Sequence, residues 1–221
     1  DLGDFKNAFK VFKGAFLFAV CSGIVAMLIV FFGAEMITRL MKTPLSIFAL
    51  KVLAPTLVVM AVLGVMRGFF QGLGTMMPSA TSQILEQIAN AIVSVWAAYV
   101  LADYGAKAGA LLGDADNYSA AYGAAGGTLG TAIGALVALL FCTFVLVVYL
   151  CAFKRSLHRE RKRNVDSYGS IFHLLIITII PVLLSSTIYN CNTVIDQAVY
   201  KHIAAYQGYT ANQYGSWNGI Y

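Results

Sequence analysis

The chain has 221 residues, of which 59% are hydrophobic and only 11% are charged. Soluble domains carry about 25% charged residues, so this composition excludes an ordinary soluble domain. The net charge of +5 comes from basic residues at the ends of apolar runs, which is typical of a membrane protein and not of a nucleic-acid-binding surface.

Five apolar runs, placed near 14–34, 49–70, 80–102, 128–153 and 170–192, are each long enough to cross the bilayer. A transmembrane helix needs about 20 apolar residues. Each span must also satisfy its own backbone hydrogen bonds within the hydrocarbon, which favours helices. The sequence therefore predicts an all-α polytopic membrane protein with about five transmembrane helices.

The connections are predicted in less detail. Residues 1–13 place phenylalanines on one face and lysines on the other, which suits a short helix in the headgroup layer. Residues 35–47 resemble an outer counterpart that is broken at Pro44. The short turn 72–74 predicts a tight hairpin between the second and third spans, with Pro78 in the first turn of the third span.

A polar stripe follows that turn. Ser79, Gln83, Glu86 and Asn90 recur at helical spacing inside the third apolar run. A carboxylate at the bilayer centre costs roughly 2.5–3.5 kcal/mol, so such residues persist where they face a partner helix or a wet cavity. A membrane protein with a polar stripe inside its bundle usually moves something polar.

Arg67 and Gln71 end the second span beside this stripe. The guanidinium fork matches a phosphate or pyrophosphate, although an arginine here would also serve by reaching the headgroups and fixing topology. Glu86 has two open interpretations as well. It is either a carrier of a proton or cation, or a hydrogen-bonded link between helices.

Further along the chain, residues 103–127 are rich in glycine, alanine and tyrosine and are predicted to form an outer loop. Gly126, Gly130 and Gly134 then form a GxxxGxxxG motif, which indicates close packing against another helix. The fifth run carries a second polar stripe with Asn190, and Asp196 lies beside it near the outer end, where water would solvate it.

The basic residues predict the topology. Ten of the fifteen lie on one side of the five spans, which the positive-inside rule assigns to the cytoplasm. Residues 1–13 and 154–168 are therefore expected in the cytoplasm of a bacterial inner membrane, and 103–127 outside. The basic residues expected inside are Lys6, Lys10, Lys13, Arg67, Lys154, Arg155, Arg159, Arg161, Lys162 and Arg163.

No motif for catalysis, nucleotide binding or metal binding is present in the sequence, and the four cysteines have no ligand-like spacing. We expect no enzymatic activity, no metal site, no cofactor and no nucleic-acid partner. The sequence does not decide whether transport is coupled to an ion, either H⁺ or Na⁺.

The segment RGFFQGLGTMMPSATSQILEQI, with GDFKNAFKVFKGAFLF before it and IPVLLSSTIYNCNTVIDQ after it, resembles a known family. This is the polysaccharide biosynthesis and stage V sporulation protein B branch of the multidrug/oligosaccharidyl-lipid/polysaccharide flippase superfamily, which is related to the lipid II flippases. The resemblance implies a transporter of two lobes with six or more helices each. Residues 1–153 would then be part of the first lobe, 154–168 the interlobe loop and 169–221 the start of the second lobe, within a longer and monomeric chain.

The resemblance also implies a function, which is the movement of an undecaprenyl-pyrophosphate-linked saccharide from the inner to the outer leaflet by alternating access. The substrate cavity would include Arg67, Gln71, Gln83, Glu86, Asn90, Asn190 and Asp196. Two alternatives stay open. A cation-coupled multidrug exporter would need Glu86 or Asp196 in an ion site, and a non-transporting scaffold of a wall-synthesis complex would not depend on the polar stripes.

Overall fold

The computed structural model describes residues 5–40, 44–157 and 168–209, and these ranges are helical throughout apart from short turns. The elements are α1 (Phe5–Leu40), a 3₁₀ turn η1 (Pro44–Ser46), α2 (Ile47–Gly72), α3 (Met77–Leu112), α4 (Ala115–Leu157) and α5 (Tyr168–Tyr206). All five α-helices are long and apolar enough to cross a membrane. The predicted all-α multi-pass membrane protein is confirmed.

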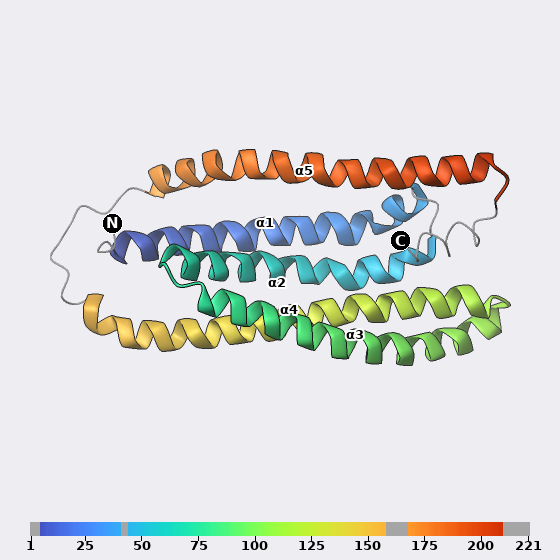
Figure 1. Ribbon diagram of the computed structural model, residues 1–221, viewed down its shortest axis with the longest axis horizontal. Helices are drawn as coiled ribbons and strands as arrows, with labels where there is room; N and C mark the ends of the chain where they lie inside the picture. Colours follow the sequence, from blue (N-terminus) through green and yellow to red (C-terminus); the bar gives the residue numbers. More distant parts are fainter. Residues whose placement is uncertain (1–4, 41–43, 158–167, 210–221) are drawn as a thin grey trace. The chain divides into compact units, whose positions relative to one another are not determined.

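The chain divides into two compact units. The first, Asp1–Asp166, contains α1 to α4, and the second, Ser167–Tyr221, contains α5. In the first unit α2 packs against α1 and α4, and α3 packs along α4 (Figure 1). The basic segment predicted to be an interlobe loop lies mostly outside the described residues, so its role stays a prediction.

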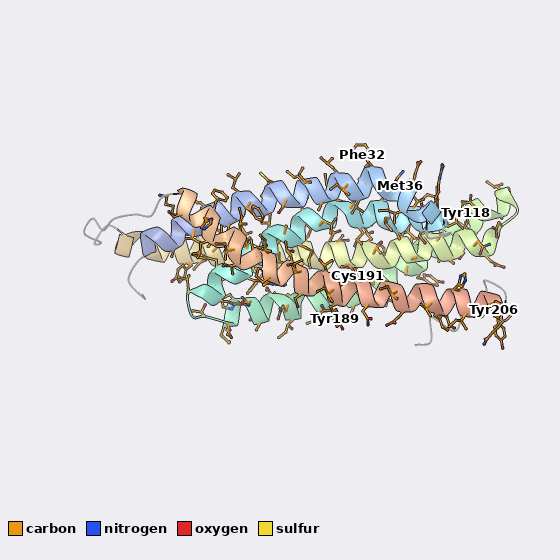
Figure 2. All side chains as sticks on the ribbon, turned by 90° about the horizontal axis from the view of Figure 1, so that it is seen from above. Phe32, Met36, Tyr118, Tyr189, Cys191 and Tyr206 are labelled. Carbon is orange, nitrogen blue, oxygen red and sulfur yellow. The ribbon has the colours of Figure 1, made fainter. Side chains whose placement is uncertain are left out.

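The core of the first unit lies between α2 and α4. It is formed by Leu63, Met66 and Phe70 of α2 with Ala138 and Cys142 of α4. Phe12 of α1 packs on this cluster and its ring lies 4.6 Å from that of Phe69. Many large apolar side chains elsewhere are exposed, and Figure 2 shows Phe32 and Met36 pointing away from α1. Such exposure in a chain of this composition is that of a lipid-facing surface.

Two predictions about the connections are wrong in part. Residues 5–13 form no separate helix in the headgroup layer, because α1 continues from Phe5 to Leu40 without a break. Of residues 35–47, those up to Leu40 extend α1, and Pro44 begins the short turn η1. Residues 41–43 lie outside the described residues.

The predicted outer loop 103–127 is also wrong, because the two helices that flank it continue to a tight turn. α3 ends at Leu112 and α4 begins at Ala115. Gly113 supplies the left-handed conformation at the turn, with φ of 79°. At 36 residues α3 is about 54 Å long, against a hydrocarbon core of about 30 Å. Residues 103–127 therefore form most of a helical hairpin rather than a loop, and their place outside the membrane stays a prediction.

The short turn between the second and third spans is confirmed, since α2 ends at Gly72, α3 begins at Met77 and Pro78 stands in the first turn of α3. The helices do not remain paired, however. Beyond the turn α3 leaves α2 and follows α4, and α2 and α3 make few contacts with each other. Polar side chains near the turn therefore carry much of the direct connection between α2 and α3.

Candidate functional site

The polar stripe of α3 is buried in a seam between helices. Ser79, Ser82 and Glu86 are buried, and Asn90 and Ser94 are half-buried. Their spacing of three and four residues places them on one face of α3, which is the face toward α4 and the end of α2. This face contains two different kinds of contact, one to each neighbouring helix.

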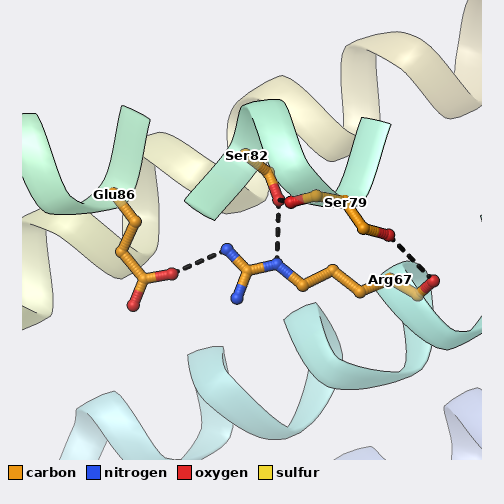
Figure 3. A network of polar contacts seen from close by, with 4 residues as sticks. All are labelled: Arg67, Ser79, Ser82 and Glu86. Atoms are coloured by element: carbon orange, nitrogen blue, oxygen red, sulfur yellow. Dashed lines mark hydrogen bonds and ion pairs between the residues drawn. The ribbon is translucent and has the colours of Figure 1, made fainter. Parts of the chain in front are cut away.

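The contact to α2 is a network around Arg67 (Figure 3). The Arg67 Nη2 donates to Glu86 Oε2 at 2.6 Å, and Arg67 Nε donates to Ser82 Oγ at 2.8 Å. The arginine and glutamate side chains are only 14% and 11% exposed. A charge-assisted hydrogen bond at this distance is among the strong ones. Of the two interpretations of Glu86, the structure therefore supports the link between helices.

Two serines orient the arginine. Ser82 Oγ donates to the carbonyl oxygen of Ser79 at 2.7 Å while it accepts from Arg67. Ser79 Oγ donates to the backbone carbonyl oxygen of Arg67 at 3.2 Å. The first turns of α3 thus hold both the backbone and the guanidinium of Arg67. Ser82 at Nε and Glu86 at Nη2 together orient the plane of the guanidinium.

The contact to α4 is made by small residues at close range. A side-chain carbon added at Gly134 would lie 2.7 Å from the backbone oxygen of Glu86, and one at Gly130 would lie 2.5 Å from the backbone nitrogen of Ser94. Real Cβ atoms do not approach this closely, so only glycine fits. The close packing predicted from the GxxxGxxxG motif is confirmed, and the partner helix is α3.

Hydrogen bonds complete the seam between α3 and α4. Ser94 Oγ lies 2.7 Å from Asn90 Oδ1 and 3.1 Å from the carbonyl oxygen of Gly127. Thr131 Oγ1 of α4 donates to Asn90 Oδ1 at 3.5 Å. Asn90 therefore contacts α4, one turn along the stripe from Glu86.

The other predicted site residues lie elsewhere. Gln71 at the end of α2 and Gln83 on α3 are exposed in the described structure. In the second unit, Asn190 donates to the Ser186 carbonyl oxygen at 2.7 Å, and Asp196 accepts from Asn192 at 3.4 Å. Both residues are exposed on α5. A cavity shared by all seven residues stays a prediction, since the two units are described separately.

Sequence reasoning missed Ser82, which is fully buried and holds Arg67. The signal was present, because Ser82 lies three residues after Ser79 and four before Glu86. Thr131 and Ser94 were missed for another reason. Their role depends on which helix packs against the stripe, and the sequence does not specify that the partner is α4.

Comparison with known proteins gives one matching family. Residues 6–113 match the family described as Polysaccharide biosynthesis protein. This chain is related to the polysaccharide biosynthesis proteins and the flippases. The matched range includes nearly all of α1 and the whole of α2 and α3, and so contains the entire Arg67 network. The predicted resemblance is confirmed.

A curated relative points in the same direction. The chain is 25% identical over 108 residues to the lipid II flippase MurJ of Bacillus subtilis (strain 168). That match covers 45% of this chain and 20% of the relative. The chain thus corresponds to about a fifth of the length of the relative that it matches. No solved structure matches the chain.

Proposed function

We propose that this chain is part of a membrane flippase that moves a polyprenyl-pyrophosphate-linked saccharide from the inner to the outer leaflet by alternating access. The observation that carries the proposal is the match of residues 6–113, which encloses a fixed, partly buried guanidinium at the end of a membrane helix. A guanidinium held in one plane suits a pyrophosphate, which it binds through two parallel hydrogen bonds.

The physical demands of the task fit this kind of chain. The polyprenyl tail of such a substrate stays in lipid, and only the charged headgroup and sugar need a polar path. Gln71 and Gln83 are exposed near the Arg67 network, and they make no hydrogen bond within the described residues. An exposed amide without a hydrogen-bond partner raises the free energy when it faces hydrocarbon, but not when it faces water. These amides therefore support a hydrated path that starts beside Arg67.

The proposal includes an orientation. With residues 1–13 and 154–168 in the cytoplasm of a bacterial cell, the Arg67 end of α2 faces the leaflet in which a lipid-linked precursor would be loaded. The hairpin tip around Gly113 would then project from the opposite face. Transport, rather than covalent chemistry, is the role that this arrangement supports.

The multidrug-exporter alternative requires Glu86 or Asp196 to hold a cation. Glu86 is already paired with Arg67. Within the described part of α5, Asp196 accepts one hydrogen bond, at 3.4 Å, from the Asn192 amide. The described residues therefore give no specific support to the exporter, and the flippase is the function that we propose.

The test is a translocation assay in proteoliposomes. The full-length protein is reconstituted with a fluorescent polyprenyl-pyrophosphate-linked saccharide, and the fraction in the outer leaflet is read by a membrane-impermeant quencher. We expect Arg67→Gln to abolish translocation while the variant remains folded. A folded Arg67→Gln protein with wild-type translocation would remove Arg67 from the substrate path, and a wild-type protein that moves no lipid-linked saccharide would overturn the proposed function itself.

A second test concerns the hydrated path. We expect Gln83→Cys, in a cysteine-free background, to react with a membrane-impermeant thiol reagent. Its neighbour Ile84, which is also exposed, is the matched control because an apolar side chain suits lipid. Equal protection of Gln83→Cys and Ile84→Cys would contradict a path along this side of α3.

A further inference from the structure

The two members of the Arg67–Glu86 pair are held unequally. Arg67 has a second anchor on α3, because its Nε is bound by Ser82, and its backbone oxygen is bound by Ser79. Glu86 has only the bond from Arg67 among the described contacts. In Figure 3 one oxygen of Glu86 and one terminal nitrogen of Arg67 make none of the drawn contacts. If the pair separates, the arginine stays in place and the carboxylate moves.

A second partner for the carboxylate lies one helical turn away. Asn90 follows Glu86 by four residues, and side chains at this spacing are neighbours on a helix surface. The Asn90 oxygen accepts hydrogen bonds from Ser94 and Thr131, which fixes the amide with its nitrogen as the remaining group. That nitrogen donates no hydrogen bond within the described part of the chain. It is a donor placed where a rotated Glu86 side chain could reach it.

A phosphate-bearing headgroup would compete with Glu86 for Arg67. Carboxylate and phosphate both match the guanidinium fork, so both cannot occupy the same donor. A ligand shifts such an equilibrium only as far as it favours one state over the other. Here the unloaded state keeps Glu86 on Arg67, and the loaded state frees Glu86 to accept from the Asn90 amide.

We propose that Glu86 is a two-position carboxylate, which occupies Arg67 in the unloaded protein and passes to Asn90 when a phosphate-bearing headgroup binds Arg67. This inference rests on the proposed function, because it needs Arg67 to meet an anionic substrate. Binding of the headgroup would thereby change how α3 is joined to α2. It removes the bond between Arg67 of α2 and Glu86 of α3, and it adds a bond within α3, from the Asn90 amide to Glu86, on the face that packs against α4.

The experiment measures ligand binding to the full-length protein in nanodiscs. The probes are a short-chain polyprenyl pyrophosphate and inorganic pyrophosphate. We expect Glu86→Gln to bind at least about fivefold more tightly than wild type, the low end of typical coupling between linked sites, because the internal competitor has lost its charge. Asn90→Asp should bind more weakly, since it offers the displaced carboxylate a like charge. Glu35→Gln, an exposed acid on α1, is the matched control and should leave binding unchanged.

The outcomes are separable. Unchanged or weaker binding by folded Glu86→Gln, together with loss of binding in Arg67→Gln, would overturn the two-position carboxylate and leave the proposed substrate site standing. Unchanged binding in Arg67→Gln would overturn both. If Glu86→Gln does not fold, Glu86→Asp, whose shorter side chain weakens the pair, should show the same gain. A gain with inorganic pyrophosphate identifies the phosphate groups as the displacing ligand, and a gain with the lipid alone identifies a headgroup delivered from the membrane.

Discussion

One face of α3 carries two seams that differ in kind. Toward α2 it is joined by an ion pair and serine hydrogen bonds, with Arg67 and Glu86 2.6 Å apart. Toward α4 it is joined by backbone contact, with Gly130 and Gly134 against the backbone of α3. A close-packed seam has one arrangement, because interiors pack without spare volume. A charged contact can exchange its partner for another ion. We therefore propose that the glycine seam supports the fold and that the charged seam serves the proposed function.

We expect the largest loss of stability when the glycine seam is disrupted. Gly130→Ala places a methyl group against the backbone of Ser94, so we expect destabilisation of about 3 kcal/mol, at the upper end of overpacking effects. The measurement is thermal unfolding of the purified protein in detergent. Gly127→Ala is the matched control, because a Cβ there meets nothing within 4 Å. The control should be neutral or slightly stabilising, and equal losses in both variants would contradict the assigned seam.

The second prediction concerns the ion pair of the charged seam. Arg67→Leu leaves Glu86 as an unpaired, largely buried carboxylate. We expect it to lower the free energy of unfolding by about 2 kcal/mol, less than the roughly 3–5 kcal/mol for breaking a fully buried pair, because water reaches both groups. Arg67→Leu/Glu86→Leu removes both charges and should recover most of that stability. The double variant should nevertheless remain inactive in translocation. Additive losses in the double variant would show that the pair does not interact as described.

The smallest expected effect concerns the hydrogen bond that holds the guanidinium of Arg67. Ser82→Ala removes one hydrogen bond to Arg67 Nε, for which we expect about 1 kcal/mol of destabilisation. Its effect on pyrophosphate binding should be larger than its effect on stability, since the guanidinium loses its fixed plane. Ser119→Ala, which removes the hydrogen bond from Ser119 Oγ of α4 to the carbonyl oxygen of Ala102 of α3 at 3.0 Å, is the matched control in the other seam. It should lower stability without changing binding per folded molecule. The reverse pattern would assign function to the α4 seam.

The sequence predicted much of this site. The stripe from Ser79 to Asn90 is visible from spacing alone, because a helix repeats its faces every three to four residues. The glycine motif likewise predicted a close helix contact. The partner of Glu86 was not predictable, since it depends on how the short turn after Gly72 folds α3 back past Arg67.

The hairpin of α3 and α4 shows a different limit. Residues 103–127 are predicted to form a loop because they are rich in glycine, alanine and tyrosine and lie between two apolar runs, but the end of an apolar run is not the end of a helix. Their alanines are strong helix formers, and α3 and α4 continue to pack against each other there. Gly105 and Gly109 lie against the backbone of residues 114–119, which allows this close packing. Helix propensity and small-residue spacing predict such an extension where hydropathy does not.

We propose that the charged seam serves transport and that the glycine seam serves the fold. The most direct measurement is translocation per folded molecule for Arg67→Gln and Ser119→Ala, reconstituted side by side with the folded fraction determined for each. We predict that Arg67→Gln is folded and inactive, whereas Ser119→Ala is less stable but moves lipid at the wild-type rate per folded molecule. Wild-type turnover by folded Arg67→Gln would contradict the account.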